Sequence, residues 1–375
     1  MNPVEQHLDK KLKERELQGN QRKLSTARTV TDLYSNDYLG LATSGLLHSE
    51  LKKHSEIIPT GSTGSRLLSG NSKETEALEQ TIAQFHKAET ALIFNSGYDA
   101  NLGLLSSLGG RHTIYIYDER CHASIIDGIQ LAQSHKKYKF RHNDIQHLAE
   151  RLNNEKDYGE IIIVIESVYS MDGNIAPIMD ICELTEKYKA VVIVDEAHAT
   201  GVIGKKGEGL VSSLELESKV FARMHTFGKA LGCHGAAVLG STQLKNYLIN
   251  FARSFIYSTA LPPHTINTIS YAYEYLSSST FSNDKLHELI KYFREQVSKS
   301  GYDNWVDSIT SIQALIIGDN TKTKQLATTL QKAGLQINPI LSPTVPEGME
   351  RLRVCLHAFN TKEEIDLLMH VLKNK

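Results

Sequence analysis

Short β-branched apolar runs alternate with helical patterns along the first two thirds of this chain, and that alternation constrains the fold most. The runs lack strict alternation of polar and apolar residues, as expected of strands buried on both faces of a parallel sheet. They are "TALIF" (90–94), "TIYIY" (113–117), "IIIVI" (161–165) and "VVIV" (191–194). Strands that alternate with helices predict an α/β domain with right-handed crossovers.

The segments between these runs carry helix signals. "NSKETEALEQTIAQFHKAE" opens with Asn71, a cap-type residue with Glu74 three positions on. It places Leu78, Ile82 and Phe85 on one face, as an amphipathic helix requires. A helix packed against the sheet is therefore predicted here.

Two further helix starts are marked by polar residues. "HNDIQHLAERLNN" begins with the cap-type residues Asn143 and Asp144. Thr361 and Glu364 form a capping box for a last helix that ends near Asn374. The first residues, "MNPVEQHLDKKLKEREL", read as a charged helix with no apolar core of a signal peptide.

The serine-rich segment "SSSTFSND" at 277–284 interrupts the pattern, either as a domain boundary or as a loop between helices. Beyond it, "SIQALIIG", "GLQINPIL" and "RLRVCLHA" are typical of strands. We predict an N-terminal helical segment over 1–45, a large, mostly parallel α/β domain over 46–276, and a smaller α+β domain over 277–375.

Composition excludes several classes of function. The formal net charge is −2, from 41 Lys+Arg and 43 Asp+Glu, so we expect neither nucleic-acid binding nor attachment to an anionic membrane. The cysteines stand far apart with no CxxC pair, which argues against a zinc ribbon and a disulfide framework. No apolar run approaches the ~18 residues of a membrane span. We expect a cytoplasmic protein without a structural metal.

Small, polar or ionisable residues follow each of the four runs. Because the carboxyl ends of parallel strands share one edge of a sheet, these residues predict a ligand site there. They are Ser96, Gly97 and Tyr98 after the first run, His122 after the second, Glu166 and Ser170 after the third, and Asp195 and His198 after the fourth.

The chemistry of these residues narrows the ligand. "NSGY" offers backbone N–H groups before a helix, an arrangement that binds phosphate. Asp195 could hold a cation or a protonated ring nitrogen, or could only cap a helix. His198 lacks the neighbours of a zinc site. Lys229, in "HTFGKALG", is an amine between glycines, and the whole set matches pyridoxal 5'-phosphate (PLP).

Several motifs in order resemble those of the α-oxoamine synthases, PLP-dependent transferases of fold type I. The motifs are "SNDYLGL", "HASIIDG", "ESVYSMDG", "VDEAHATGVIG" and "TFGKALG". The similarity runs from about Asn36 to the C-terminus. It implies an acyltransferase that condenses an amino acid with an acyl thioester and releases carbon dioxide.

The resemblance implies a catalytic set and a cofactor site. Lys229 would bond covalently to the cofactor aldehyde, Asp195 would pair with the ring nitrogen, and His122 would stack on the ring. His198 and Thr226 would lie near the phenolic oxygen and the phosphate, and Ser170 would bond the ring oxygen. The remaining cofactor contacts would come from Gly97, Tyr98, Glu166 and, across a homodimer with shared sites, Ser258 and Thr259.

Substrate contacts are implied as well. Arg353, helped by Asn36, would bind the amino-acid carboxylate, and Thr344 would face the acyl group. Many members of one branch of the family have an arginine where this chain has Leu341, so Arg22 is the candidate for a terminal acyl carboxylate. Three residues keep a second reading: Glu166 as an organiser of loops, Thr344 as a turn residue, and Tyr98 as a core residue.

The substrate pair stays open at this level. L-alanine with a pimeloyl thioester, on coenzyme A or a carrier protein, fits "GSTGSRLLSGN", "IYSTALPPH" and "PTVPEGMERLRVCLHA". Glycine with acetyl-CoA fits "HASIIDGIQL" and "YDAN", and serine with a long acyl thioester is a further possibility. A non-catalytic cofactor-binding or scaffold protein is the alternative from a different class.

Overall fold

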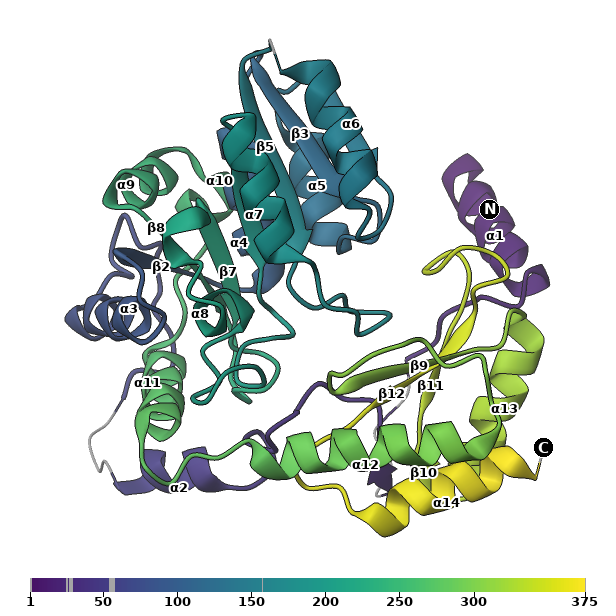
Figure 1. Ribbon diagram of the computed structural model, residues 1–375. Helices are drawn as coiled ribbons and strands as arrows, with labels where there is room; N and C mark the ends of the chain where they lie inside the picture. The colour runs from purple at the N-terminus through teal and green to yellow at the C-terminus, as the bar shows by residue number, and fades with distance from the viewer. Residues whose placement is uncertain (1, 25, 27–29, 54–57, 157, 375) are drawn as a thin grey trace. The chain divides into compact units, whose positions relative to one another are not determined.

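The computed structural model describes residues 2–24, 26, 30–53, 58–156 and 158–374 (Figure 1). The chain divides into two compact units, each formed by segments that are distant in the sequence. The first unit contains Met1–Asn36, Met171–Gly173 and Leu286–Lys375, and the second contains Asp37–Ser170 and Asn174–Lys285. The unit limits fall at 36/37 and 285/286. The predicted domain limits at 45/46 and 276/277 stay a prediction.

The second unit contains a large sheet. Among its described residues the sheet has seven strands in the order β2-β8-β7-β6-β5-β3-β4. Their bounds are β2 Thr90–Phe94, β3 Thr113–Asp118, β4 Lys136–Phe140, β5 Glu160–Glu166, β6 Val191–Asp195, β7 Ala222–Thr226 and β8 Ala236–Gly240. The four predicted runs are thus strands β2, β3, β5 and β6.

The sheet is mostly parallel, as predicted, with one exception. Strands β4, β3, β5, β6 and β7 pair in parallel, but β8 pairs antiparallel with both β7 and β2. Two successive reversals leave β2 pointing the same way as β7, so the ends of all four predicted strands still lie at one edge.

Helices cover both faces of this sheet, which explains why its strands read as continuous apolar runs. One core forms where side chains such as Tyr115, Val164 and Met224 pack against Leu104 and Ile125 of the helices. The helices of this unit are α2 Leu46–Lys53, α3 Lys73–Phe85, α4 Gly97–Leu108, α5 Ala123–Leu131, α6 Ile145–Glu155, α7 Ile178–Lys187, α8 Leu210–Ser213, α9 Thr242–Phe251, α10 Arg253–Ile256 and α11 Pro263–Ser277.

The helix starts agree with the sequence except at α3. Asp144 caps α6 by accepting the backbone N–H of His147 at 2.8 Å. At α3 the cap is Ser72, whose hydroxyl accepts from the N–H of Thr75 at 3.2 Å. Asn71 was the wrong choice, because its side chain instead bonds Arg66 at 2.7 Å and another side chain of the helix.

The first unit is a smaller α+β structure. An antiparallel sheet of order β11-β12-β9 pairs Asn338–Ile340 with Arg351–Cys355, which in turn pairs with Ile312–Ile316. A short parallel pair joins β1 (Thr31–Asp32) to β10 (Leu335–Gln336). The helices are α1 Pro3–Leu17, α12 Asp284–Ser300, α13 Asn320–Lys332 and α14 Lys362–Lys373.

The ends of the chain follow their sequence signals. The predicted capping box of Thr361 and Glu364 opens α14, and Asn374 is its C-cap. The charged N-terminal helix is α1, which buries none of its side chains. Over the described ranges, no helix combines the length and the apolar character needed to cross a bilayer.

Candidate active site

Two carboxylates end neighbouring strands at the predicted edge. Glu166 closes β5 and Asp195 closes β6, and their Cα atoms pair in the sheet register. Asp195 is 5% exposed, and its oxygens accept from the Ala197 backbone N–H at 2.9 Å and from the Asn101 amide at 2.8 Å. Those two bonds fix the orientation of a buried anion, so Asp195 does more than cap a turn.

The lysine of the "HTFGKALG" motif lies beside the predicted histidine. Lys229 follows β7, and its Nζ is 2.7 Å from His198 Nε2. On the other side of the ring, His198 Nδ1 is 2.8 Å from the Tyr38 hydroxyl. Gly232 closes the loop with φ +64°, and a Cβ there would lie 2.3 Å from the backbone nitrogen of Ala42. The loop conformation therefore requires glycine at this position.

His122 precedes α5 and caps it. Its Nδ1 accepts from the Ser124 backbone N–H at 3.2 Å and lies 2.8 Å from the Ser124 hydroxyl. Although His122 is exposed at the surface, the atoms around it displace enough water to lower the pKa of its imidazole, and the charge of Lys229 lowers it further. Asp195 acts in the opposite direction. The loss of solvation thus favours the neutral form of the ring.

Glu166 is both an electrostatic partner of the site and an organiser of its loops. Burial raises the pKa of its carboxyl group well above the ordinary value, and the charge of Asp195 raises it further. The charge of Lys229 and backbone hydrogen bonds from His122 and Ser170 oppose this shift. Glu166 therefore links the loop after β3 to the loop after β5, as its second reading proposed.

The N-terminus of α4 faces the end of β7. A Cβ built on Gly97, the first helical residue, would lie 3.5 Å from the Thr226 hydroxyl oxygen. Ser96 caps the helix by accepting the N–H of Asp99 at 3.0 Å. Tyr98 is 43% exposed and bonds the Asp127 carboxylate, so the core reading of Tyr98 is wrong.

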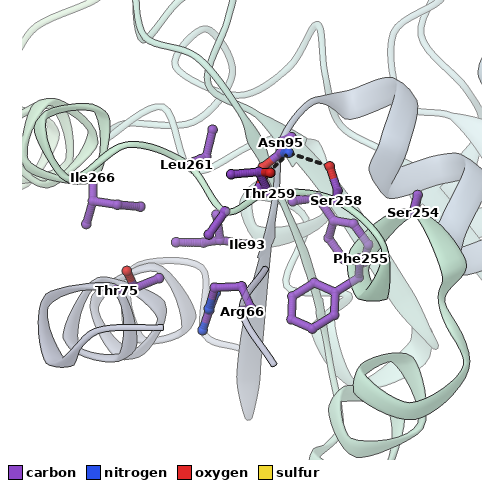
Figure 2. A pocket seen from close by; sticks show the side chains of 12 residues that line it. Arg66, Thr75, Ile93, Asn95, Ser254, Phe255, Ser258, Thr259, Leu261 and Ile266 are labelled. Carbon is purple, nitrogen blue, oxygen red and sulfur yellow. Dashed lines mark hydrogen bonds between the residues drawn. The ribbon is translucent and has the colours of Figure 1, made fainter. Parts of the chain in front are cut away.

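Ser258 and Thr259 contact Asn95, two residues before this helix (Figure 2). The Asn95 side-chain amide donates to the Ser258 hydroxyl at 2.7 Å and to the Thr259 carbonyl at 2.7 Å. The segment also pairs with the 61–71 loop through an isolated bridge from Ser65 to Thr259. Figure 2 shows Asn95, Ser258 and Thr259 around one pocket, which Arg66 also lines. That Ser258 and Thr259 contact the cofactor of a partner subunit stays a prediction.

The predicted substrate residues lie in the first unit and pair among themselves. Arg353, on β12, donates to the Asn36 side chain at 3.0 Å and to Cys355 Sγ at 2.9 Å. Arg22 donates to the Thr344 hydroxyl at 3.0 Å. Thr344 is also a turn residue, with its N–H bonded to the carbonyl of residue 341 at 2.9 Å, as its second reading proposed.

The residues of the second unit fit PLP. An oxygen of the buried Glu166 carboxyl, Oε1, has no hydrogen-bond partner among the described residues, which signals a missing polar neighbour. Asp195 beside it supplies the acid that a protonated pyridine nitrogen needs, Lys229 supplies an amine, and the start of α4 supplies N–H groups for a phosphate. Asp195, Lys229 and Gly97 are thus the residues of this unit whose chemistry suits the cofactor.

Two residues of the site escaped the sequence reasoning. Asn101 lies one turn inside α4 and reads as an ordinary polar helix residue, yet its amide bonds both Asp195 and Ser124. Tyr38 falls within "SNDYLGL" but received no role. Asn101 is only 2% exposed, and this burial of a polar side chain indicates its role in the site. The burial can be seen only in the folded chain.

Known proteins resemble the chain over nearly its whole length. The family described as aminotransferase class I and II matches residues 28–372. An 8-amino-7-oxononanoate synthase of Emericella nidulans is 40% identical over 363 residues, covering 91% of this chain and 88% of the relative.

Solved structures agree. A solved structure described as SPT (serine palmitoyltransferase) with a PLP internal aldimine superposes on this chain with a TM-score of 0.86 at 27% identity. The match covers 92% of this chain and 87% of the other. An 8-amino-7-oxononanoate synthase from Francisella tularensis superposes with a TM-score of 0.77 at 27% identity, covering 92% and 97%.

The fold and these matches define a PLP-dependent enzyme of fold type I. The chain belongs to the aminotransferase class I and II family and, within it, to the α-oxoamine synthases.

Proposed function

We propose that the enzyme condenses L-alanine with a pimeloyl thioester to give 8-amino-7-oxononanoate, a step of biotin biosynthesis. The observation that carries this proposal is the relative of that name at 40% identity over 91% of the chain. A carbon–carbon bond forms between alanine Cα and the thioester carbonyl carbon. The thiol of coenzyme A or a carrier protein leaves, and the alanine carboxylate departs as carbon dioxide.

The cofactor is proposed to be held by groups at the edge of the large sheet. Asp195 pairs with the ring nitrogen, the Gly97 and Tyr98 amides bind the phosphate, and His122 stacks on the ring. Ser170, His198 and Thr226 complete the polar contacts. When bound, PLP supplies an electron sink for the negative charge that develops at the amino-acid Cα.

Proton movement is assigned to Lys229. Its Nζ takes the proton from alanine Cα and later returns a proton to the product carbon. His198, 2.7 Å away, orients that amine and carries hydrogen bonding onward to the Tyr38 hydroxyl at 2.8 Å. A neutral His198 that accepts from Lys229 through Nε2 donates to Tyr38 through Nδ1–H. The three side chains therefore form an ordered relay.

Arg353 is proposed to bind the alanine carboxylate. The residue is 8% exposed, and the Asn36 side chain accepts from one guanidinium nitrogen at 3.0 Å. A planar guanidinium binds a carboxylate through two parallel bonds, which a lysine cannot reproduce. Arg353→Lys should therefore raise the KM for alanine by about tenfold to a hundredfold, the equivalent of roughly 1.5–3 kcal/mol. An unchanged KM for alanine would remove Arg353 from this role.

A substrate panel tests the proposed reaction. Purified enzyme with PLP is assayed for thiol release from pimeloyl-, acetyl- and palmitoyl-CoA with L-alanine, glycine and L-serine in every pairing. We expect the highest kcat/KM for pimeloyl-CoA with L-alanine, and a parallel assay with the pimeloyl carrier protein separates the two donors. Preference for glycine with acetyl-CoA, or serine with palmitoyl-CoA, would contradict the assignment.

A second test addresses the cofactor bond. Wild-type protein with PLP should show a visible absorption band that borohydride abolishes, and Lys229→Ala should lack it and lose about 10²–10⁴-fold in kcat. Lys219→Ala is the matched control, since that lysine pairs with Glu186 at 2.9 Å on the surface and should behave as wild type. If wild-type protein shows no reducible band, the enzyme proposal fails.

Recognition of the terminal acyl carboxylate is proposed for Arg22. Leu341 cannot bind an anion, whereas Arg22 is exposed and held at the Thr344 turn by a 3.0 Å bond. Arg22→Gln should raise the KM for pimeloyl-CoA and leave the KM for a heptanoyl thioester, which lacks the carboxylate, unchanged. Equal effects on both donors would show a role other than carboxylate binding.

We also propose a homodimer with shared sites in the cytoplasm. Large apolar side chains are exposed on the second unit around one surface pocket, including Leu131 at 66%, Phe251 at 57% and Tyr247 at 37%. Patches of this kind mark interfaces. Four free cysteines fit a reducing compartment. Light scattering should give twice the 41.8 kDa chain mass, and Phe251→Glu should lower it.

A further inference from the structure

The turn after β4 connects the loop that follows β3 to the hairpin that follows β5. His142 Nδ1 lies 3.1 Å from Asp118 Oδ1, at the end of β3. Its Nε2 lies 3.2 Å from Asn174 Oδ1, in the hairpin 167–175 that follows β5. One side chain from the edge strand therefore spans the end of the neighbouring strand and reaches the loop beyond it.

Asn143 repeats the same connection. Its backbone N–H donates to Asp118 Oδ2 at 2.9 Å, and its side-chain amide donates to the Ile175 carbonyl at 3.0 Å. The residue adopts φ +53°, a left-handed conformation that asparagine tolerates better than most residues. This strained backbone directs both donors of Asn143 toward their partners, and it explains why Asp144, not Asn143, caps α6.

Asp118 carries the connection toward His122. Its side chain is fully buried and accepts the Arg120 backbone N–H at 2.8 Å. Its carbonyl accepts the N–H of Cys121 at 3.1 Å. Asp118 thus stabilises the turn immediately before His122. A shift of its carboxylate would therefore move His122, the N-cap of α5.

The hairpin carries the connection toward Ser170. An antiparallel bridge joins residues 168 and 175, and the Tyr169 N–H donates to the Asn174 carbonyl at 3.0 Å. The His142 ring meets the Tyr169 ring edge-on, with centroids 4.4 Å apart. Asn174 and Tyr169 therefore fix the conformation of the hairpin in which Ser170 lies.

The connection through His142 holds in either protonation state of the ring. A doubly protonated imidazole donates to both oxygens. A neutral imidazole donates to Asp118 and accepts at Nε2 once the Asn174 amide turns its nitrogen toward the ring, a rotation that needs no backbone movement. Both nitrogens of the His142 ring therefore keep a hydrogen-bond partner in either state.

We propose that His142 and Asn143 are positioning residues of the active site, which hold the loop of His122 and the hairpin of Ser170 in register through Asp118, Asn174 and Ile175. The inference rests on the proposed function for its kinetic consequence, since His122 and Ser170 are the proposed cofactor contacts. Glu166 also connects these two loops, because its carboxyl group accepts hydrogen bonds from the backbone N–H groups of His122 and Ser170. The turn that contains His142 and Asn143 is a second connection between the same two loops.

The decisive variant is His142→Phe, which keeps a ring against Tyr169 and removes both nitrogens. Hydrogen–deuterium exchange of the full-length protein, with and without PLP, is followed in segments 119–124 and 167–175. Exchange should rise in both segments, kcat should fall by about tenfold to a hundredfold with a smaller change in KM, and the visible circular dichroism per bound PLP should change.

Arg141→Ala is the matched control. Arg141 belongs to the same turn, but its side chain is 59% exposed and bonds Asp144 at 2.8 Å, away from both loops. It should leave exchange in the two segments and kcat as in the wild type. A purely local role of His142 would raise exchange around 139–145 alone, and that result, or a kcat within about twofold of wild type, overturns the proposal.

Asn143→Gly keeps the test valid if the phenylalanine variant does not fold. Glycine adopts φ +53° without strain and keeps the N–H bond to Asp118, so only the bond to the Ile175 carbonyl is lost. Exchange should rise in 167–175 and stay unchanged in 119–124; no rise in 167–175 overturns the role of Asn143. If the wild type binds no PLP, the proposed function fails while the exchange data still decide the connection.

Discussion

Asn101 shows how much one uncharged side chain contributes to the electrostatics of the site. Its amide donates to Asp195 Oδ2 at 2.8 Å and to the Ser124 hydroxyl at 2.9 Å, and the residue is 2% exposed. A buried carboxylate that loses such a donor pays for desolvation without compensation. Asn101 thus orients the carboxylate that is proposed to meet the cofactor ring.

Asn101→Ala should weaken PLP binding by about tenfold to a hundredfold, since a hydrogen bond to a charged group contributes about 1.5–3 kcal/mol. PLP affinity is measured by absorbance titration of apoprotein. Asn246→Ala is the control, because Asn246 lies on the exposed side of α9. Equal PLP affinity for wild type and Asn101→Ala would show that Ala197 alone suffices to orient Asp195.

Residue types at strand ends were readable from the sequence, but their partners were not. Asp195 and Lys229 follow strands of recognisable pattern, so both positions could be predicted. Tyr38 lies 160 positions from His198 along the chain, and nothing local indicates that the two side chains meet at 2.8 Å. Contacts of this kind depend on the tertiary fold, which sequence patterns of short range do not encode.

At the scale of elements, α4 and α5 approach each other through a glycine. A Cβ on Gly128 of α5 would lie 2.9 Å from the Asn101 carbonyl and 3.0 Å from Leu105 Cβ. The close approach places Ser124 of α5 beside the Asn101 amide. Glycine inside a helix is normally unfavourable by about 1 kcal/mol relative to alanine, so the contact outweighs local propensity.

Gly128→Ala should therefore destabilise the protein by about 1–3 kcal/mol, because backbone and not a flexible side chain must yield. Gln130→Ala, on the exposed face of the same helix, is the matched control and should be neutral or slightly stabilising. Urea unfolding measures both. A more stable Gly128→Ala protein would show that α5 moves away without loss.

A second element-scale feature lies in the first unit, where a buried ion pair joins β12 to the short segment Met171–Gly173. Arg351 is 2% exposed, and its guanidinium pairs with the Asp172 carboxylate, which is also 2% exposed. The Ser308 hydroxyl adds a bond to the Gly173 carbonyl at 3.1 Å. Removing one partner leaves the other charge buried and unpaired.

Asp172→Ala and Arg351→Met should each destabilise the protein by about 3–5 kcal/mol, and the double variant by clearly less than their sum. The comparison is made by urea unfolding, with Asp307→Ala as the control, since Asp307 pairs with Arg294 while its own side chain is 94% exposed. Strictly additive losses would show that the two charges do not stabilise each other.

For the whole molecule, the order of strands and helices was more predictable than the sheet itself. The β-branched runs gave β2, β3, β5 and β6 almost to the residue. The reversed strand β8, "AAVLG", carries mostly small residues and no distinct β-branched run. Its antiparallel pairing with β2 follows from long-range sheet formation, for which a single sequence holds no local signal.

A pair of buried histidines makes the stability of the whole molecule depend on pH. His86 and His225 are fully buried, with ring centroids 3.9 Å apart. Burial, followed by the charge of Arg223, lowers the pKa of His86 to about 3. Burial also lowers the pKa of His225 well below its ordinary value, with further contributions from His86 and Arg223.

The direction in which the free energy of unfolding changes with pH depends on how many protons each state binds. Between the unfolded value of about 6.5 and the folded value of about 3, the unfolded chain binds a proton at His86 and the folded chain does not. The free energy of unfolding therefore falls as the pH drops through this window, by about 1.4 kcal/mol per pH unit for each such histidine. Glu166, whose pKa is raised, acts in the opposite direction, so the net slope is smaller.

A comparison of variants isolates the histidine contribution. His86→Gln should reduce the slope of unfolding free energy against pH by about 1.4 kcal/mol per unit between pH 6 and 5, whatever its effect at pH 7. His135→Gln, at an exposed position, should leave the slope as in the wild type. Urea unfolding at each pH gives the slopes. Equal slopes for His86→Gln and wild type would mean that the folded protein protonates His86 as readily as the unfolded chain does.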